Sequence, residues 1–214
     1  ASVGQLAAGL AHELGNPLAA VIGYLEILKE RVQNENAEIA SCALSEAERI
    51  DYLVRELLNF SRPTEVEPGL LDPVAVLRSA VVLLDNQGVF SRLKLIDQLP
   101  EKLGTAQIIN HKIQQLFINL LLNAAQASPE GQIRLSAGQS DGVLWIKIDD
   151  DGCGIAPDHI SKIFDPFYTT KEPGEGTGLG LSICHRIVEE AKGSLSVVSK
   201  IGEGSCFKVE LPFV

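Results

Sequence analysis

Hydrophobic residues in the first part of the chain recur in alternating steps of four and three. One such run extends from Ala7 to Val32 and a second from Ala40 to Leu57, with a polar break at residues 33–36 between them. This spacing is typical of helices that pack along an apolar seam, so we predict a helical hairpin. One hairpin offers too little surface to bury both seams. The pattern therefore predicts a homodimer whose two hairpins form a four-helix bundle.

The helical pattern ends at a stretch that contains Pro63 and Pro68, which cannot continue a helix. We therefore expect an all-α domain at residues 1–62, a linker at residues 63–70 and a second domain at residues 71–214. The linker is the expected boundary because its prolines stand among Thr and Glu rather than in an apolar pattern.

Helical and strand patterns are interleaved in the second domain. Asp72 followed by Pro73 is typical of a helix start, and that helix is expected to reach about Leu84. Longer helices are expected near His111–Ala127 and Leu179–Ala191. Strands are expected at Leu93–Asp97, Gln132–Ala137, Val143–Asp149, Ser194–Ser199 and Cys206–Leu211, with a hairpin turn at Ser140–Gly142. Together they predict a sheet with helices on one face.

Composition excludes several classes of protein. The net charge of −10 leaves no basic stripe to release counterions from nucleic acid, so nucleic acid is not an expected partner. No apolar run approaches the roughly 20 residues of a membrane-spanning helix. We therefore expect no membrane contact by this fragment, and we expect a cytoplasmic location. The chain starts at Ala1 and contains no Met, so we expect a longer protein whose input domain, and any membrane anchor, lie upstream. The four cysteines lack the spacing of a metal site or a redox dithiol.

The first helix carries a histidine on the face opposite its apolar seam. Asn16 lies one turn after His12 on that face, and Glu13 flanks it. Small residues surround this patch, which lets another protein approach closely. Taken alone, an exposed histidine is most often only a polar surface residue.

The run from His12 to Leu18 resembles the H box of histidine kinases, whose pattern is H-E-x-x-N-P-L. The resemblance implies that His12 is a phosphoacceptor and that Glu13 takes its proton. It further implies that Asn16 orients a water or the phosphoryl group in the reverse, phosphatase direction.

Three segments of the second domain have features of a ligand site. Asn119 and Asn123, with Gln115 one turn before, line up on the helix near residues 111–127, and half-buried amides need either a protein network or a ligand. Residues 150–154 form a D-x-G-x-G after a strand, which fits a simple glycine turn or a ligand loop. Residues 174–181 place alternate glycines before a helix, which suits phosphate but fits neither the dinucleotide-binding nor the P-loop fingerprint.

These segments match, in order, the boxes of the histidine kinase ATP domain, a member of the GHKL ATPase superfamily with an α/β sandwich fold. The boxes are the N box Ile118–Ala124, the glycine boxes Asp150–Gly154, Gly176–Leu181 and Gly202–Ser205, and the F box Phe164–Lys171. The resemblance implies that Asp150 binds the adenine amino group, that Asn119 and Asn123 hold Mg²⁺, and that Lys171 approaches the phosphates of ATP. The other nucleotide-binding residues that it implies are Gly152, Gly154, Gly176, Gly178, Gly180, Leu181 and Ser205.

The expected function is that of a two-component sensor kinase core. Such a protein autophosphorylates His12 from ATP and transfers the phosphoryl group to an aspartate of a response regulator receiver domain, with phosphatase activity as a second reaction. The span Pro166–Gly176 is expected to be a lid that orders over ATP. The alternatives are a GHKL-type ATPase and a degenerate kinase that only scaffolds partners. Against the first, the N-box helix offers Gln115 and asparagines where those ATPases carry a catalytic glutamate.

Overall fold

A computed structural model describes residues 17–29, 31–32, 36–45, 47, 50, 67–171 and 176–214. The chain divides into two compact units, Ala1–Glu65 and Val66–Val214. In the described part of the chain, no helix has both the length and the apolar character needed to span a membrane.

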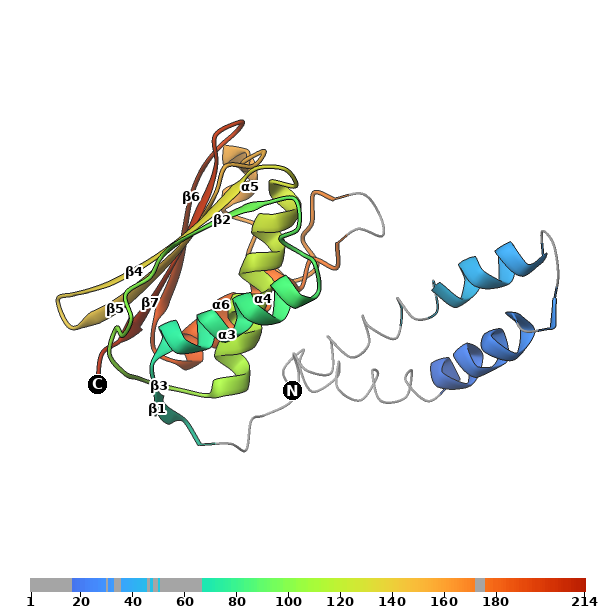
Figure 1. The fold of residues 1–214 in the computed structure, drawn as a ribbon, viewed down its shortest axis with the longest axis horizontal. Helices are drawn as coiled ribbons and strands as arrows, with labels where there is room; N and C mark the ends of the chain where they lie inside the picture. Colours follow the sequence, from blue (N-terminus) through green and yellow to red (C-terminus); the bar gives the residue numbers. More distant parts are fainter. Residues whose placement is uncertain are drawn as a thin grey trace. The chain divides into compact units, whose positions relative to one another are not determined.

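The first unit is helical at residues 17–29 and 36–45, as the heptad spacing predicts (Figure 1). Within the single chain, Ala40 and Ala47 of the seam are buried. Other seam residues are not, because Val21 is 46% exposed and Ile50 is 49% exposed. The single hairpin therefore leaves part of its apolar seam in contact with water.

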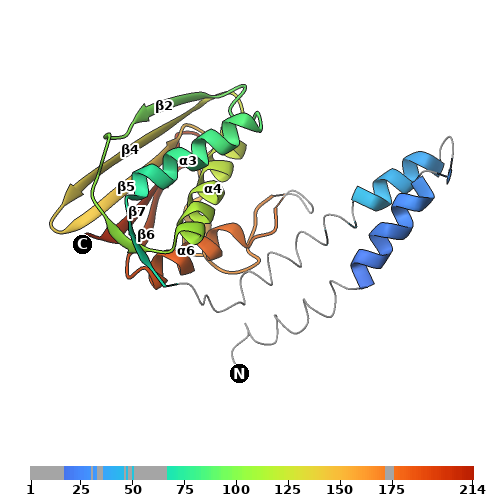
Figure 2. The same ribbon diagram turned by 60° about the horizontal axis from the view of Figure 1, so that its bottom comes forward.

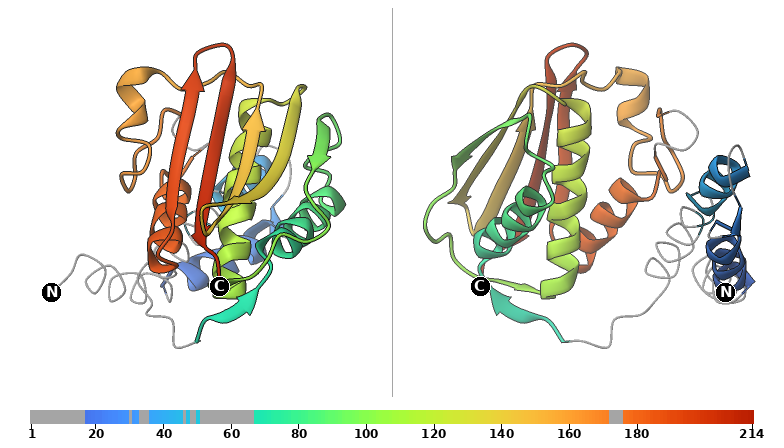
Figure 3. Two further views of the ribbon diagram at one scale, coloured as in Figure 1. Left: turned by 90° about the vertical axis from the view of Figure 1, so that its left-hand side faces the viewer. Right: turned by 45° about the vertical axis from the view of Figure 1, so that its right-hand side comes forward.

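The second unit is a five-stranded sheet with the strand order β2-β4-β5-β7-β6, and helices cover one of its faces (Figures 1 and 3). This confirms the predicted sheet with helices on one face. The strands of the sheet are β2 Lys94–Gln98, β4 Gln132–Ser140, β5 Val143–Asp150, β6 Ser194–Lys200 and β7 Gly204–Pro212. The covering helices are α3 Pro73–Asn86, α4 Asn110–Ala127 and α6 Gly180–Glu190. The same two layers appear from a second direction in Figure 2.

The core lies between the sheet and α4. Phe117 of α4 is fully buried, and so are Leu116 and Leu120 of the same helix. The sheet contributes alternate residues of β5, such as Ile146, while the residues between them face the uncovered side. This alternation directs every second side chain of β5 towards the helices, including that of Asp150 at its end.

Capping and turn chemistry explain why the predicted elements begin and end where they do. The Asp72 carboxylate accepts a hydrogen bond from Val74 N at 2.9 Å and so caps α3. The β4–β5 hairpin turns at Asp141 and Gly142, whose φ angles of 50° and 76° fit a type I′ turn. The helix start and the hairpin turn are both confirmed.

Three short elements were not predicted. β1 Gly69–Leu71 pairs with β3 Ala106–Ile108 in a separate two-stranded sheet, and α5 Pro157–Ile160 follows the first glycine box. The first two residues of β1 fall within the linker that we expected at residues 63–70. Strand pairing therefore begins inside the stretch that composition marks as a linker.

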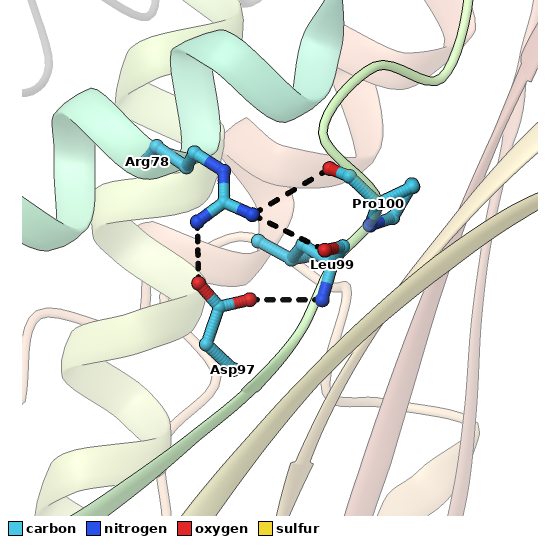
Figure 4. Close-up of polar contacts among 4 residues, drawn as sticks. All are labelled: Arg78, Asp97, Leu99 and Pro100. Carbon is cyan, nitrogen blue, oxygen red and sulfur yellow. Dashed lines mark hydrogen bonds and ion pairs between the residues drawn. The ribbon is translucent and has the colours of Figure 1, made fainter.

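A polar cluster fixes the end of β2, the parallel strand at one edge of the sheet (Figure 4). Arg78 of α3 pairs with the carboxylate of Asp97 and donates to the carbonyl of Leu99 at 3.2 Å and to that of Pro100 at 3.5 Å. Asp97 also accepts from Leu99 N at 2.8 Å. Helix and edge strand are thereby held together where the chain leaves the sheet.

Candidate functional site

The centre of the candidate site is the carboxyl group of Asp150 at the end of β5. The residue is only 7% exposed, and its carboxyl group accepts a hydrogen bond from Gly152 N at 2.9 Å. The β5–β7 register places Ser205 directly opposite it. Burial raises the pKa of Asp150, against the opposing effect of backbone hydrogen bonds from Gly152 and Ser205. A buried carboxylate of this kind gains from a ligand that donates a hydrogen bond.

The amides on α4 lie where the helical pattern placed them. Gln115, Asn119 and Asn123 are all half-buried. Asn119 Nδ2 donates to the carbonyl of Gly180, the first residue of α6, at 3.4 Å. One turn beyond Asn123, the Ala127 carbonyl accepts from Cys153 N at 3.2 Å. The middle of α4 thus faces the second glycine box, and its end faces the first.

Crowding by the chain's own backbone explains the glycines of the first glycine box. A Cβ on Gly154 would lie 2.1 Å from the Lys200 carbonyl oxygen, and one on Gly152 would lie 2.4 Å from that of Ala127. The room that we expected to serve a ligand is therefore occupied by the chain's own backbone at both positions. At Gly180, by contrast, an added Cβ would meet only Asn119 Cγ, at 3.9 Å. At Gly178, however, the backbone of Phe167 comes within 2.4 Å of an added Cβ, so among the described residues the open space lies beside Gly180.

The open start of α6 has the chemistry of a phosphate site. The first N–H groups of a helix lack intrahelical partners and carry the positive end of its dipole. Leu179 is the N-cap residue of α6 and makes no side-chain capping bond, and Leu181 lies half-buried in the first turn. Just before the helix, Gly178 has a φ angle of 67°, a conformation that favours glycine.

A backbone hydrogen bond connects the middle of the F box to the middle of the second glycine box. Phe167 N donates to the carbonyl of Gly178 at 3.0 Å. Beyond that bond lies Lys171, whose ammonium donates to the side-chain oxygen of Gln126 at the end of α4. Gly176 is close to the same segment, since a Cβ there would lie 2.8 Å from Thr169 Oγ1. Residues 172–175 lie outside the described part of the chain.

Several of the predicted nucleotide-binding residues therefore gather along the second half of α4. Gly152 and Ser205 lie beside Asp150, Asn119 contacts Gly180, and Lys171 reaches α4 through Gln126. Gly154 is the exception, because it packs on the β6–β7 turn. The predicted catalytic residues His12, Glu13 and Asn16 lie outside the described residues.

Sequence reasoning missed two contacts at this site. Gln126 continues the α4 amide line three residues after Asn123, and that spacing could have identified it. The Tyr168 hydroxyl bonds to Nδ1 of His159, whose helix α5 was not predicted, so no sequence signal could have identified that pair.

The donor set fits magnesium better than a transition metal. Among the described residues no group of three His, Cys, Asp or Glu side chains could hold a metal ion. Amide oxygens from α4, supplemented by phosphate oxygens and water, are the hard ligands that Mg²⁺ accepts. Asn119 and Asn123 lie on the face of α4 that meets the open start of α6, which suits this arrangement.

Comparison with protein families supports the same two-part organisation. Residues 2–65 match the His Kinase A (phospho-acceptor) domain. Residues 109–214 match the family described as histidine kinase-, DNA gyrase B- and HSP90-like ATPase. The second match covers all the boxes of the candidate nucleotide site.

Curated relatives are longer than this chain. It is 38% identical to the signal transduction histidine-protein kinase AtoS of Escherichia coli, over 99% of this chain and 35% of AtoS. It is 34% identical to sporulation kinase E of Bacillus subtilis, over 98% of this chain and 28% of that protein. The sensor histidine kinase ZraS of Escherichia coli is 35% identical over 99% of this chain and 46% of its own length. The chain thus spans less than half the length of these relatives.

Solved structures show the same fold. Full-length ShkA in complex with AMPPNP covers the whole chain with a TM-score of 0.82 and 26% identity, over 46% of ShkA. The catalytic domain of histidine kinase ThkA covers 69% of this chain and 97% of its own, with a TM-score of 0.62 and 27% identity. ThkA in complex with the response regulator TrrA is 24% identical with a TM-score of 0.72, over 99% of this chain and 62% of ThkA, and at that identity the likeness concerns the fold.

Proposed function

The chain belongs to the histidine kinase family, and on that premise we propose that it is the catalytic core of a two-component sensor kinase. In this proposal the core phosphorylates its own His12 from ATP and passes the phosphoryl group to an aspartate of a response regulator. It also removes phosphate from that partner.

The observation that carries the proposal is the buried carboxyl group of Asp150. The carboxylate of a residue that is only 7% exposed is costly unless a donor completes its hydrogen bonds. The adenine amino group is such a donor, and Gly152 and Ser205 hold the carboxylate where the base would meet it. Leu181 and the amides of Gly176, Gly178 and Gly180 would then line the path of the phosphates towards α6.

The open start of α6 gives the phosphates their place in this proposal. Asn119 and Asn123 would hold Mg²⁺, which reduces the repulsion between phosphate oxygens and the incoming nucleophile when it is bound. Lys171 supplies a positive charge from the F box. Gly154 has an indirect part, since it packs the first glycine box against the β6–β7 turn.

His12 and its neighbours would perform the chemistry in the first domain. A nitrogen of the His12 ring attacks the γ-phosphorus while Glu13 accepts the proton from the other ring nitrogen, and ADP leaves with the electron pair of the broken P–O bond. Asn16 would orient water in the reverse reaction. We propose residues 1–62 as the domain for dimerisation and phosphotransfer, residues 63–70 as the linker and residues 71–214 as the ATP-binding domain.

We propose a homodimer because the hairpin seam is incompletely buried in one copy. Val21 and Leu28 are each 46% exposed although both lie on the predicted seam. A second hairpin would cover them in a four-helix bundle, as the heptad spacing requires.

Incubation of the chain with labelled ATP tests the proposal. Label should appear on the wild-type chain in an acid-labile, alkali-stable form, and His12→Gln should abolish it. Binding of AMPPNP to His12→Gln should be unchanged, because the nucleophile and the nucleotide site belong to different domains. Hydrolysis of ATP without labelling would favour a GHKL-type ATPase. A chain that is not labelled and does not bind nucleotide would favour a scaffold.

A further inference from the structure

A row of three polar side chains crosses neighbouring strands at the end of the apolar face of the sheet. The register places Ser205 of β7 opposite Asp150 of β5 on one side and opposite Ser199 of β6 on the other. The next row on the same face contains buried Ile148 and Phe207. Polar side chains beside such a core are costly unless they bond to one another or to a ligand.

The hydroxyl group of Ser199 makes three hydrogen bonds. It accepts from Ile155 N, which follows the first glycine box, at 2.8 Å, and it donates to the carbonyl of Gly204 at 2.9 Å. Its third contact is with Ser205 Oγ at 2.9 Å. A hydroxyl has one proton and two lone pairs, and the Gly204 carbonyl takes the proton. The contact between the two serines is therefore one in which Ser205 donates and Ser199 accepts.

This arrangement leaves the Ser205 hydroxyl with lone pairs only. Its proton is directed to Ser199, which is its hydrogen-bond partner within the described part of the chain. The Asp150 carboxylate in the same row is also an acceptor. The adenine amino group has two N–H donors, whereas guanine carries a carbonyl oxygen at the same position of the ring. Two acceptors side by side therefore suit adenine and disfavour guanine.

We infer that Ser199 is a positioning residue, which holds the Ser205 hydroxyl as an acceptor for the second N–H of the adenine amino group. The inference rests on the proposed function, in which the first N–H meets Asp150. Ser199 lies outside the family boxes, and it contacts Ser205 rather than the base. Its effect on the choice of nucleotide must therefore pass through Ser205.

Calorimetric titration of the full chain with two nucleotides tests the inference. One is AMPPNP, and the other is its analogue with purine as the base, in which hydrogen replaces the amino group. The ratio of the two affinities measures what the amino group contributes. In Ser199→Ala the Ser205 proton loses its acceptor and is free to turn towards the base. The ratio should therefore fall about threefold to tenfold, the scale of one hydrogen bond. A merely structural role would weaken both nucleotides alike.

Further variants separate the hydroxyl of Ser199 from its shape. Ser199→Thr and Ser199→Val have side chains of the same shape and differ in the hydroxyl, so the ratio should be retained in the first and should fall in the second. In a Ser205→Ala background, Ser199→Ala should not change the ratio further, because the group that it positions is gone. The matched control is Ser196→Ala, the same exchange at an exposed position of β6, which should leave the ratio unchanged.

The possible outcomes have distinct meanings. Wild-type binding of AMPPNP with an unchanged ratio in Ser199→Ala or Ser199→Val would refute the inference and leave the proposed function standing. An equal fall in Ser199→Thr and Ser199→Val, or a further fall in the Ser205→Ala background, would also refute it. A wild-type chain that binds no AMPPNP would refute the proposed function itself.

Discussion

Replacing Asp150 with Asn should change nucleotide affinity and protein stability in opposite directions. The substitution keeps the shape of the side chain and an oxygen that can accept from Gly152 N, but it removes the charge. A hydrogen bond from adenine to a charged acceptor contributes about 1.5–3 kcal/mol, so AMPPNP binding should weaken about 10- to 150-fold.

The stability of the nucleotide-free chain should rise at neutral pH. Burial raises the pKa of Asp150 above its ordinary value of 3.8, so the folded state resists ionisation more than the unfolded state does. The buried charge therefore lowers the unfolding free energy by its full amount at pH values above the raised pKa, and it has no effect at pH values below the ordinary pKa. The variant should therefore unfold at a higher temperature than the wild type at pH 7.5, and the difference should close towards pH 4.

Two measurements on the same protein samples check this pair of effects. Calorimetric titration with AMPPNP gives the affinity, and thermal unfolding from pH 4 to pH 8 gives the stability. Asp149→Asn is the matched control, because the neighbouring side chain has the same charge but faces the uncovered side of the sheet. It should change AMPPNP affinity by less than about twofold, the size of a screened surface effect.

Either of two results would refute the reasoning. Unchanged affinity in Asp150→Asn would mean that the adenine is bound elsewhere. A lower unfolding temperature at pH 7.5 would mean that the charge itself stabilises the domain through its backbone hydrogen bonds.

Three further predictions follow from single residues. Asn16→Ala should slow dephosphorylation of a cognate response regulator about 10- to 100-fold, the cost of a lost positioning contact, and should reduce autophosphorylation less, as paired kinase and phosphatase assays would show. The Ser128 hydroxyl lowers the pKa of exposed Asp151, so Ser128→Ala should reduce the unfolding free energy by about 0.5–1 kcal/mol at pH 7. Urea titrations should show that this deficit disappears as the pH falls through the lowered pKa of the Asp151 carboxyl group. Burial raises the pKa of Cys206 to about 12, and Asp149 adds to the effect. Brief treatment with iodoacetamide at pH 8 should therefore alkylate exposed Cys153 well before Cys206, which mass spectrometry would show.

The sequence predicted the long elements of the second unit because their patterns repeat several times. α4 begins one residue before the expected start at His111, and β5 ends one residue beyond the expected Asp149. β1, β3 and α5 have only three or four residues each, which is too short for an apolar period to develop. Such elements are determined by what the rest of the fold places beside them.

The candidate site was predicted in part for the same reason. The residues of the boxes could be named from their order along the chain, and the structure brings Asn119, Lys171 and the loop after Asp150 to the second half of α4. What could not be predicted is which neighbour each one contacts. The bond of Lys171 to Gln126 joins residues 45 positions apart, and no local pattern determines a contact at that separation.

The strand order has a consequence for the way the domain folds. β4 and β5 are joined by a tight turn, so their pairing closes a very short loop and is expected to be fast. β5 pairs next with β7, and that pairing must first close the long segment that contains the first glycine box, α6 and β6. Ser205 can reach Asp150 only when this closure is complete. During synthesis the domain should therefore gain its affinity for nucleotide last, after its final strand has left the ribosome.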